Sequence, residues 1–267
     1  MRDAAVFLNQ PLIVGQDGDC LRLTINRPDQ RNALSLALLD ELADVLARQA
    51  GRADLKCVVL TGAGDRCFAA GGDLKELDAV RSPADTQAMS RRVRAALHAV
   101  RHFPVPVVAA LNGLALGGGA ELAMACDLRI AAPRAELGFL QTQLNVTTAW
   151  GGGIDLLSLV GPARSLALLV EARRIPAAEA LALGLVDRVC ADGETLAACV
   201  DRFLAPFLKR PVQVLRACKA LTLGARLAWH ERLAGTEEAG FVECWTHADH
   251  WSAAANALTP RSPENSG

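Results

Sequence analysis

The sequence predicts an α/β fold, with a mixed core of strands and helices followed by an all-helical region. Up to residue 194, short apolar segments typical of strands alternate with segments that repeat apolar residues at helical spacing. Beyond this point the strand-like segments stop, and helical patterns continue to about residue 258. We therefore expect an α/β core over residues 1–194, a helical region over 195–258 and a disordered tail over 259–267.

Four segments of the core have the pattern of strands. Residues 19–26 (DCLRLTIN) alternate polar and apolar side chains, which is typical of a half-buried strand. Short apolar runs bounded by proline, glycine or polar residues predict buried strands elsewhere. These strands are expected within residues 55–61, 104–113 and 127–132.

Helical patterns separate these strands and fill the rest of the chain. Residues 33–48 are rich in Leu and Ala, and residues 91–103 carry arginines that we interpret as a solvated helix face. Residues 136–153 lack regular periodicity and are expected to form a loop ending in a glycine triplet. Further helices are expected at residues 162–170, 194–209 and 211–223, a helix followed by a short strand at 176–189, and a mainly helical remainder.

The chain is organised around residues 113–127, which read GLALGGGAELAMACD. Three glycines lead into good helix formers, so the pattern indicates a strand, a glycine turn and a helix. The first amides of a helix have no internal acceptor and carry the positive end of the helix dipole. Glu121 lies in the first helical turn, three residues after Gly118. The stretch therefore predicts an anion-binding site with a proton-transfer group beside it.

A second unit of the same layout precedes it, FAAGGDLKEL at residues 68–77. Each unit places glycine where a strand ends and a helix begins, so Gly72 and Gly118 are each expected to offer one amide. Two converging amides suit a thioester oxygen that becomes an enolate. The alternative is that these glycines only permit tight packing, and the presence of Glu121 favours the anion hole.

Composition and charge favour a metabolic protein over one that binds nucleic acid or membranes. The formal net charge is −1, with 51% hydrophobic and 21% charged residues. No apolar run reaches the roughly 18–20 residues that span a bilayer, so a cytoplasmic location is expected. The eight cysteines have no C-x-x-C pair and no metal-ligand spacing, and are interpreted as reduced thiols.

Several motifs in order resemble the enoyl-CoA hydratase/isomerase (crotonase) superfamily. They are RPDQRNALS, FAAGGDLKEL, PVPVVAALNGLALGGGAELAMACDLRIA, AWGGG with VGPARSLAL, and AAEALALGLVDRV, all within residues 19–223. The resemblance implies a spiral of ββα units with a helical C-terminal trimerisation region, acting on acyl-CoA thioesters. It also implies a homotrimer or a dimer of trimers.

The resemblance assigns roles to individual residues. The oxyanion hole falls on Gly72, where alanine is commoner, and on Gly118, and the first catalytic glutamate falls on Glu121. Asp73 is expected to be structural. The substrate-binding residues implied by the resemblance are Arg31, Ala33, Ala69, Ala70, Gly71, Leu74, Gly117, Leu140 and Trp150.

The departures from the family pattern bear on the reaction. Gln141 stands where hydratases have a second catalytic glutamate, and Leu140 stands where proline is usual. A glutamine amide can position water but cannot carry a proton near neutral pH. Trp150 is expected either to wall the acyl pocket or to pack in the core, and Asp155 to be a solvated helix residue. Near the C-terminus, only Arg261 remains as a basic group for the coenzyme A phosphate.

These observations predict an enoyl-CoA hydratase-like lyase with one catalytic glutamate, Glu121. Gly72 and Gly118 would bind the thioester oxygen, and Gln141 would position the water. The alternatives are decarboxylation of a malonyl-CoA-type thioester, isomerisation of an enoyl-CoA double bond, and an acyl-CoA binder without catalysis. No cofactor is expected beyond the coenzyme A of the substrate, and no metal.

Overall fold

Two β-sheets form the core of the protein. The computed structural model describes residues 10–258, so Arg261 and the predicted tail lie outside the described residues. One sheet has the order β1-β2-β3-β5-β7-β10, and the other β4-β6-β8-β9. The strands of the first sheet are β1 Leu12–Asp17, β2 Cys20–Ile25, β3 Cys57–Gly62, β5 Val107–Leu111, β7 Leu128–Ala131 and β10 Arg188–Val189. Those of the second are β4 Cys67–Ala69, β6 Leu114–Leu116, β8 Glu136–Gly138 and β9 Ile175–Pro176.

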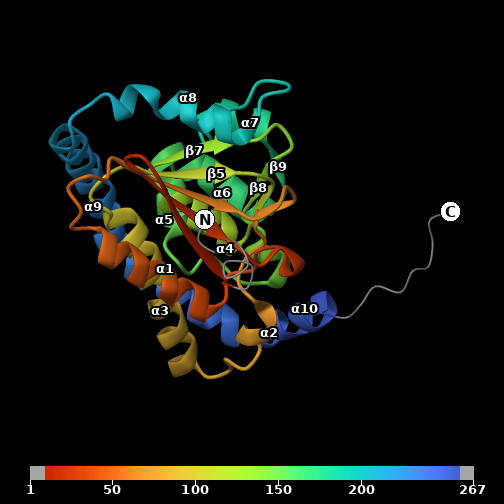
Figure 1. Cartoon of the computed structure of the whole chain (residues 1–267). Helices are drawn as coiled ribbons and strands as arrows, with labels where there is room; N and C mark the ends of the chain where they lie inside the picture. Colours follow the sequence, from red (N-terminus) through yellow and green to blue (C-terminus); the bar gives the residue numbers. More distant parts are fainter. Residues whose placement is uncertain (1–9, 259–267) are drawn as a thin grey trace.

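Helices surround these sheets (Figure 1). In chain order they are α1 Leu36–Gln49, α2 Leu74–Leu77, α3 Pro83–His102, α4 Gly118–Ala125, α5 Gly152–Val160, α6 Pro162–Glu171, α7 Ala177–Ala182, α8 Leu196–Leu208, α9 Val212–Thr246 and α10 Ala248–Leu258. Two short 3₁₀ helices, η2 Pro28–Gln30 and η3 Gln141–Leu144, lie in the loops. No helix within residues 10–258 is long and apolar enough to cross a membrane.

The chain winds between the two sheets in a repeated ββα pattern. The pairs β3–β4, β5–β6 and β7–β8 each place the first strand in the six-stranded sheet and the second in the four-stranded sheet. A helix or 3₁₀ helix follows each pair. Strand β6 pairs in parallel with both β4 and β8. The carboxyl ends of these three strands therefore meet at one edge of the second sheet.

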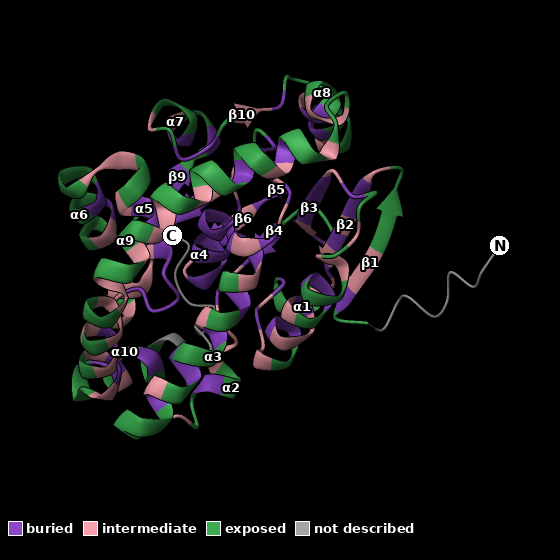
Figure 2. Ribbon diagram, turned by 90° about the vertical axis from the view of Figure 1, so that its left-hand side faces the viewer, coloured by how far each residue is buried: buried purple, intermediate pink, exposed green. Residues whose placement is uncertain are grey.

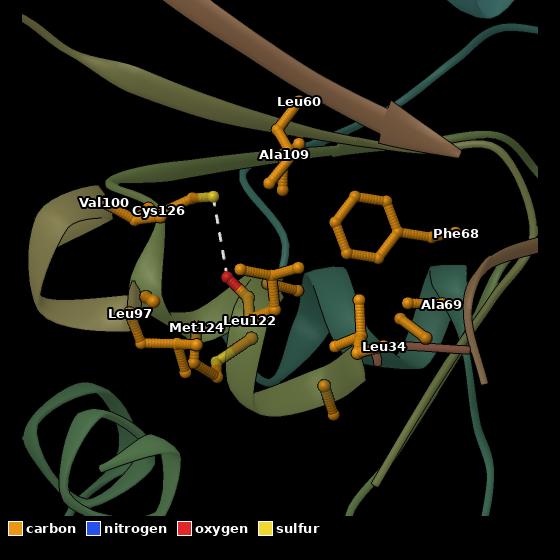
Figure 3. Close-up of a cluster of buried hydrophobic side chains, with 14 of the residues drawn as sticks. Leu34, Leu60, Phe68, Ala69, Leu97, Val100, Ala109, Leu122, Met124 and Cys126 are labelled. Atoms are coloured by element: carbon orange, nitrogen blue, oxygen red, sulfur yellow. Dashed lines mark hydrogen bonds between the residues drawn. The ribbon is translucent and has the colours of Figure 1, made fainter. Parts of the chain in front are cut away.

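Helix α4 lies in the centre of the molecule. All of its residues are buried, and Figure 2 shows it enclosed by other elements. Figure 3 shows the side chains around it: Leu97 and Val100 of α3, Phe68 and Ala69 of β4, and Leu122 and Met124 of α4. Apart from Glu121 every side chain of this helix is apolar, so the helix is stable only inside the core, and this fixes the position of its first turn.

Most predicted elements of the core are confirmed. The four predicted strands correspond to β2, β3, β5 and β7, and the helix expected at 33–48 corresponds to α1. Ser35 caps that helix by accepting a hydrogen bond from Leu38 N. Helix α3 begins at Pro83, well before the expected residue 91, because Ser82 caps it in the same way through Asp85 N.

Two further predictions about the elements are wrong, and one strand was missed. Residues 136–153 are not a continuous loop, because they contain β8 and η3. Strand β1 was not expected, since half of its residues are exposed and its position depends on pairing with β2. The predicted end of a helix at residue 223 is also wrong, because α9 continues without interruption from Val212 to Thr246.

The C-terminal helices pack on different parts of the core. Helix α8 lies against β5 and β7, α9 packs on α3 and α5, and α10 contacts η3. Within residues 10–258 no strand follows β10. The division into a core up to residue 194 and a helical region from 195 stays a prediction.

Candidate active site

Three stretches that are far apart in the sequence meet at the edge formed by β4, β6 and β8. Gly72 follows β4, Gly117 and Gly118 follow β6, and Gln141 follows β8. The amide of Gly117 donates to Gly138 O across 2.8 Å. Parallel pairing of the three strands thus brings together the residues that the sequence assigned to catalysis.

The amides of Gly72 and Gly118 are available to a ligand. Within residues 10–258 neither amide donates a hydrogen bond, although Leu34 N donates to Gly71 O and Asp73 N to Leu34 O on either side of Gly72. Gly118 N lies near the residue before Gly72, since a Cβ atom on Gly71 would lie 3.7 Å from it, and the Trp150 ring lies against both Gly72 and Gly118. Two neighbouring amides without an acceptor are suited to an oxyanion.

The Trp150 ring packs against both glycines. A Cβ atom on Gly118 would lie 1.9 Å from Cζ3 of the ring, and one on Gly72 would lie 3.2 Å from Cη2. Trp150 is 6% exposed and belongs to the main apolar cluster. It therefore fills a place in the core and also borders both amides, so the two roles considered for it are compatible.

Glu121 lies in the first turn of α4 and is 2% exposed. Its Oε2 accepts hydrogen bonds from Trp150 N at 2.8 Å and Gly152 N at 3.0 Å. Its Oε1 accepts from Gln141 Nε2 at 3.0 Å and from Ala149 N at 3.4 Å. The carboxylate is thus fixed by the loop that carries Trp150.

The environment of Glu121 raises its pKa to about 7. Burial is the main cause, since the charged form loses its contact with water, and the negative charge of Glu237 adds to it. The hydrogen bonds from Trp150 N, Gly152 N and Gln141 oppose the rise. Such a carboxyl group can take up and release a proton near neutral pH.

Gln141 lies beside Glu121, as the comparison of motifs implied. Its Nε2 is committed to Glu121, and its Oε1 is buried without a hydrogen-bond partner in the described part of the chain. An unpartnered acceptor in a buried site costs free energy unless a ligand or water supplies a donor. Gln141 can therefore bind a donor next to the carboxyl group.

The residues implied for coenzyme A also lie together. Ala70 N donates to Arg31 O across 3.1 Å, and Leu34 N donates to Gly71 O across 2.8 Å. Residues 31–34 thus run alongside residues 70–72. Arg31 is exposed and adopts a left-handed conformation, with φ 53°.

Other predicted contact residues surround the glycine-rich edge. Gly117 and Leu140 are partly exposed just after β6 and β8, and Leu74 is partly exposed at the start of α2. Ala69 is buried in β4, and Ala33 is partly exposed in the segment beside it. Asp73 pairs with Arg27 Nη2 across 2.9 Å. This ion pair agrees with the structural role expected for Asp73.

The expectation that Asp155 is a solvated helix residue is wrong. Asp155 is 1% exposed and pairs with Arg101 Nη2 at 2.7 Å, Arg226 Nε at 2.9 Å and His230 Nε2 at 2.8 Å. Burial alone would raise its pKa, but the neighbouring cations outweigh this and hold the pKa well below 3.8. Asp155 is therefore a permanent anion and not an acid catalyst.

Glu237 was not identified from the sequence. It comes from α9, and its carboxylate accepts hydrogen bonds from Gly151 N at 2.9 Å and Thr148 Oγ1 at 2.8 Å. Arg94 completes the contact by pairing with it across 2.9 Å. No local pattern distinguishes Glu237 from its neighbour Glu238, because its partners lie more than 85 positions away.

Two cavities of the protein lie away from this site. One of about 450 Å³ is lined by residues of α4, α5, α8 and α9, and one of about 340 Å³ by residues around β1, β2 and α8. Neither is lined by Glu121, Gly72 or Gly118. Within residues 10–258 no group of three or more His, Cys, Asp or Glu side chains is arranged to hold a metal ion.

A family model described as enoyl-CoA hydratase/isomerase matches residues 16–248. The chain belongs to the enoyl-CoA hydratase/isomerase family. Among relatives of this family, a short-chain-enoyl-CoA hydratase of Clostridium acetobutylicum is 32% identical, covering 95% of this chain and 96% of its own. An ethylmalonyl-CoA decarboxylase of Xenopus laevis is 30% identical, covering 86% of this chain and 77% of its own.

A solved member of the enoyl-CoA hydratase/isomerase family has the same fold. It is an enoyl-CoA hydratase from Mycobacterium avium subsp. paratuberculosis K-10, with a TM-score of 0.83 and 28% identity. The match covers 92% of this chain and 98% of that one. The predicted crotonase fold is therefore confirmed, and the family acts on acyl-CoA thioesters.

Proposed function

We propose that the protein is an acyl-CoA lyase that adds water to a 2-enoyl-CoA thioester, or removes it, through a thioester enolate. One observation carries this proposal: two amides without an acceptor within residues 10–258, at Gly72 and Gly118, lie beside a buried carboxyl group whose pKa is about 7. The amides suit a developing oxyanion and the carboxyl group suits proton transfer.

The proposed reaction uses Glu121 for both proton transfers. Ionised Glu121 takes a proton from water while the water oxygen adds to C3, and the electrons of the double bond move onto the thioester oxygen. The amides of Gly72 and Gly118 bind that oxygen. The protonated carboxyl group then returns the proton to C2, which gives the 3-hydroxyacyl thioester. The unpartnered Oε1 of Gln141 would accept a hydrogen bond from the second O–H of the water, whose proton stays on the new hydroxyl group.

The substrate is proposed to lie along the edge of the second sheet. Coenzyme A would follow residues 31–34 and 69–71, and the acyl group would contact Trp150, Leu74 and Leu140. Because coenzyme A is part of the substrate, the reaction needs no other cofactor. A cytoplasmic location is part of this proposal.

A second candidate is decarboxylation of a malonyl-CoA-type thioester. The C–C bond to the substrate carboxylate breaks, carbon dioxide leaves, and the electrons form the same enolate, which is then protonated at C2. Gln141 in place of a second carboxylate favours this reaction, because a further anion would repel the substrate. A pKa of about 7 for Glu121 also leaves a neutral population at neutral pH.

A substrate screen followed by mass spectrometry tests the proposal. The protein is incubated separately with crotonyl-CoA, 3-hydroxybutyryl-CoA, 3-enoyl-CoA, methylmalonyl-CoA and ethylmalonyl-CoA, beside Glu121→Gln. Interconversion of crotonyl-CoA and 3-hydroxybutyryl-CoA that Glu121→Gln lacks supports hydration. Release of carbon dioxide without water addition supports the second candidate, and double-bond migration alone indicates an isomerase. Binding of these thioesters without turnover of any of them contradicts the proposal and supports an acyl-CoA binder.

A homotrimer, or a dimer of trimers, is proposed for the assembly. Exposed large apolar side chains occur on α5, α6 and α9, namely Leu159, Leu166, Val170, Val214, Leu221 and Trp229. Two of them, Leu159 and Trp229, line the cavity of about 450 Å³. Exposed apolar surface of this kind favours a subunit interface. Sedimentation equilibrium tests the assembly, and a monomer at micromolar concentration would contradict it.

A further inference from the structure

Glu237 connects the long helix α9 to the loop beside Glu121. Its side chain is 8% exposed. One oxygen accepts from Thr148 Oγ1 at 2.8 Å, and the other accepts from Gly151 N and pairs with Arg94, both at 2.9 Å. The same Nη2 of Arg94 also donates to Ala149 O at 3.0 Å.

The backbone amides of residues 149–152 donate hydrogen bonds to two different carboxylates. Glu121 accepts from the amides of Ala149, Trp150 and Gly152. Glu237 accepts from the amide between them, that of Gly151. The loop that carries Trp150 is therefore fixed from α4 on one side and from α9 on the other.

We propose that Glu237 is a positioning residue for the Glu121 site. It fixes residues 148–151 and therefore the Trp150 ring over Gly72 and Gly118, and its negative charge acts on Glu121 across the loop. The inference rests on the proposed function in one respect, namely that Glu121 carries the proton. The contacts of Glu237 with the loop do not depend on which thioester reacts.

Among the charged groups around the loop, Glu237 is the acidic one that raises the pKa of Glu121. From α3, Arg94 pairs with Glu237, and Arg101 donates to Trp150 O at 3.1 Å. Asp155 of α5 pairs with the guanidinium groups of Arg101 and Arg226 and lies 2.8 Å from His230 Nε2. From η3, Gln141 is neutral. After burial, the charge of Glu237 is the largest influence that favours the protonated form of Glu121.

The test compares Glu237→Gln with Glu238→Gln. Glutamine keeps the shape of the side chain and an oxygen that can accept from Gly151 N, but it removes the charge. Glu238 is the matched control on the same helix, because its carboxylate binds Arg91 and Gln87 and, within residues 10–258, accepts no hydrogen bond from the loop. The titration of Glu121 is followed by ¹³C NMR of labelled glutamate carboxyl groups, with the resonance assigned by its loss in Glu121→Gln.

We expect the Glu121 midpoint to fall by roughly half to one pH unit in Glu237→Gln, since a like charge is removed and Arg94 loses its partner. Glu238→Gln should leave the midpoint unchanged. The same midpoint in Glu237→Gln and the wild-type protein would overturn the effect of charge. Because the NMR titration needs no substrate, it decides this inference even if the substrate screen rejects the proposed reaction.

Hydrogen exchange tests the effect on position. In Glu237→Ala, the amides of residues 149–152 are expected to exchange at least about tenfold faster, because one of the two carboxylates that hold the loop is gone. In Glu238→Ala they should exchange as in the wild-type protein. Unchanged exchange of these amides in Glu237→Ala would contradict the positioning role.

Discussion

The amide group of Gln141 donates a hydrogen bond from Nε2 to Oε1 of Glu121 across 3.0 Å. A neutral group thus occupies the place beside Glu121 where the family pattern has a second carboxylate. Its oxygen remains without a partner among the described residues. This contact leaves Glu121 as the group that can carry protons, while Gln141 can only orient a donor.

Gln141→Glu is expected to increase the rate of hydration. It places a second acid/base group beside Glu121, so kcat for crotonyl-CoA hydration should rise about tenfold or more. Gln143→Glu is the control, because Gln143 is exposed and binds Ala172 O through its amide. If decarboxylation of a malonyl-CoA-type thioester is the reaction, the added anion should instead slow it. An unchanged rate of whichever reaction the protein catalyses would contradict the role given to Gln141.

Gly118→Ala should damage the site far more than Gly72→Ala. The new methyl group would lie 1.9 Å from Trp150 at residue 118 but 3.2 Å from it at residue 72. We expect kcat/KM to fall about 10²–10³-fold for Gly118→Ala, because the clash moves the amide of residue 118 out of position, which is comparable to losing one oxyanion donor. We expect little change for Gly72→Ala, because its methyl group would meet only side-chain atoms of Leu77 at 3.0 Å and Trp150 at 3.2 Å. The same clash should lower the free energy of unfolding of Gly118→Ala, measured by urea unfolding. Adding Trp150→Phe should recover part of this loss, because the smaller ring relieves the clash. Similar losses in both single variants would refute this explanation.

Asp155→Asn should destabilise the fold. It leaves the buried guanidinium of Arg101 and that of Arg226 without a full counter-charge, which typically costs about 3–5 kcal/mol. Urea unfolding at pH 7 measures this loss, with Asp40→Asn as the control, since the pair of Asp40 with Arg92 is largely exposed. A change as small as that of the control would show that the buried cluster adds no stability.

The contribution of Asp155 to the free energy of unfolding should depend on pH. The pKa of Asp155 is depressed in the folded protein, so its contribution is fully present above the ordinary value of 3.8. That contribution is lost as the pH falls from there toward the folded-state pKa. The difference in stability between wild type and Asp155→Asn should therefore shrink below pH 3.8 and be constant above it.

Local patterns were sufficient for much of the core and for part of the site. Alternation and glycine turns predicted β2, β3, β5 and β7, and the motifs brought Gly72, Gly118, Glu121 and Gln141 into one hypothesis. The structure places these four residues together because the strands before Gly72, Gly118 and Gln141 are parallel neighbours. Their catalytic roles stay proposals.

Contacts over long distances in the sequence could not be predicted. Asp155 has the pattern of a surface helix residue, but Arg226 and His230 of α9 cover it 71 and 75 positions later. Glu237 lies in a helix with polar residues on several faces, and its role depends on a loop 86 positions earlier. Hydrophobic periodicity carries no information about such pairs.

The central claim is that Glu121 acts as a base with a pKa of about 7. A base works in its ionised form, so kcat/KM for hydration of crotonyl-CoA should rise with pH and reach half its maximum near pH 7. Decarboxylation would show the opposite slope, because ionised Glu121 repels the carboxylate of the substrate. The decisive measurement is therefore the pH profile of kcat/KM for wild type and Glu121→Gln. We predict a rise through about pH 7 that Glu121→Gln lacks, and a profile that is flat or equal in both proteins would contradict the account.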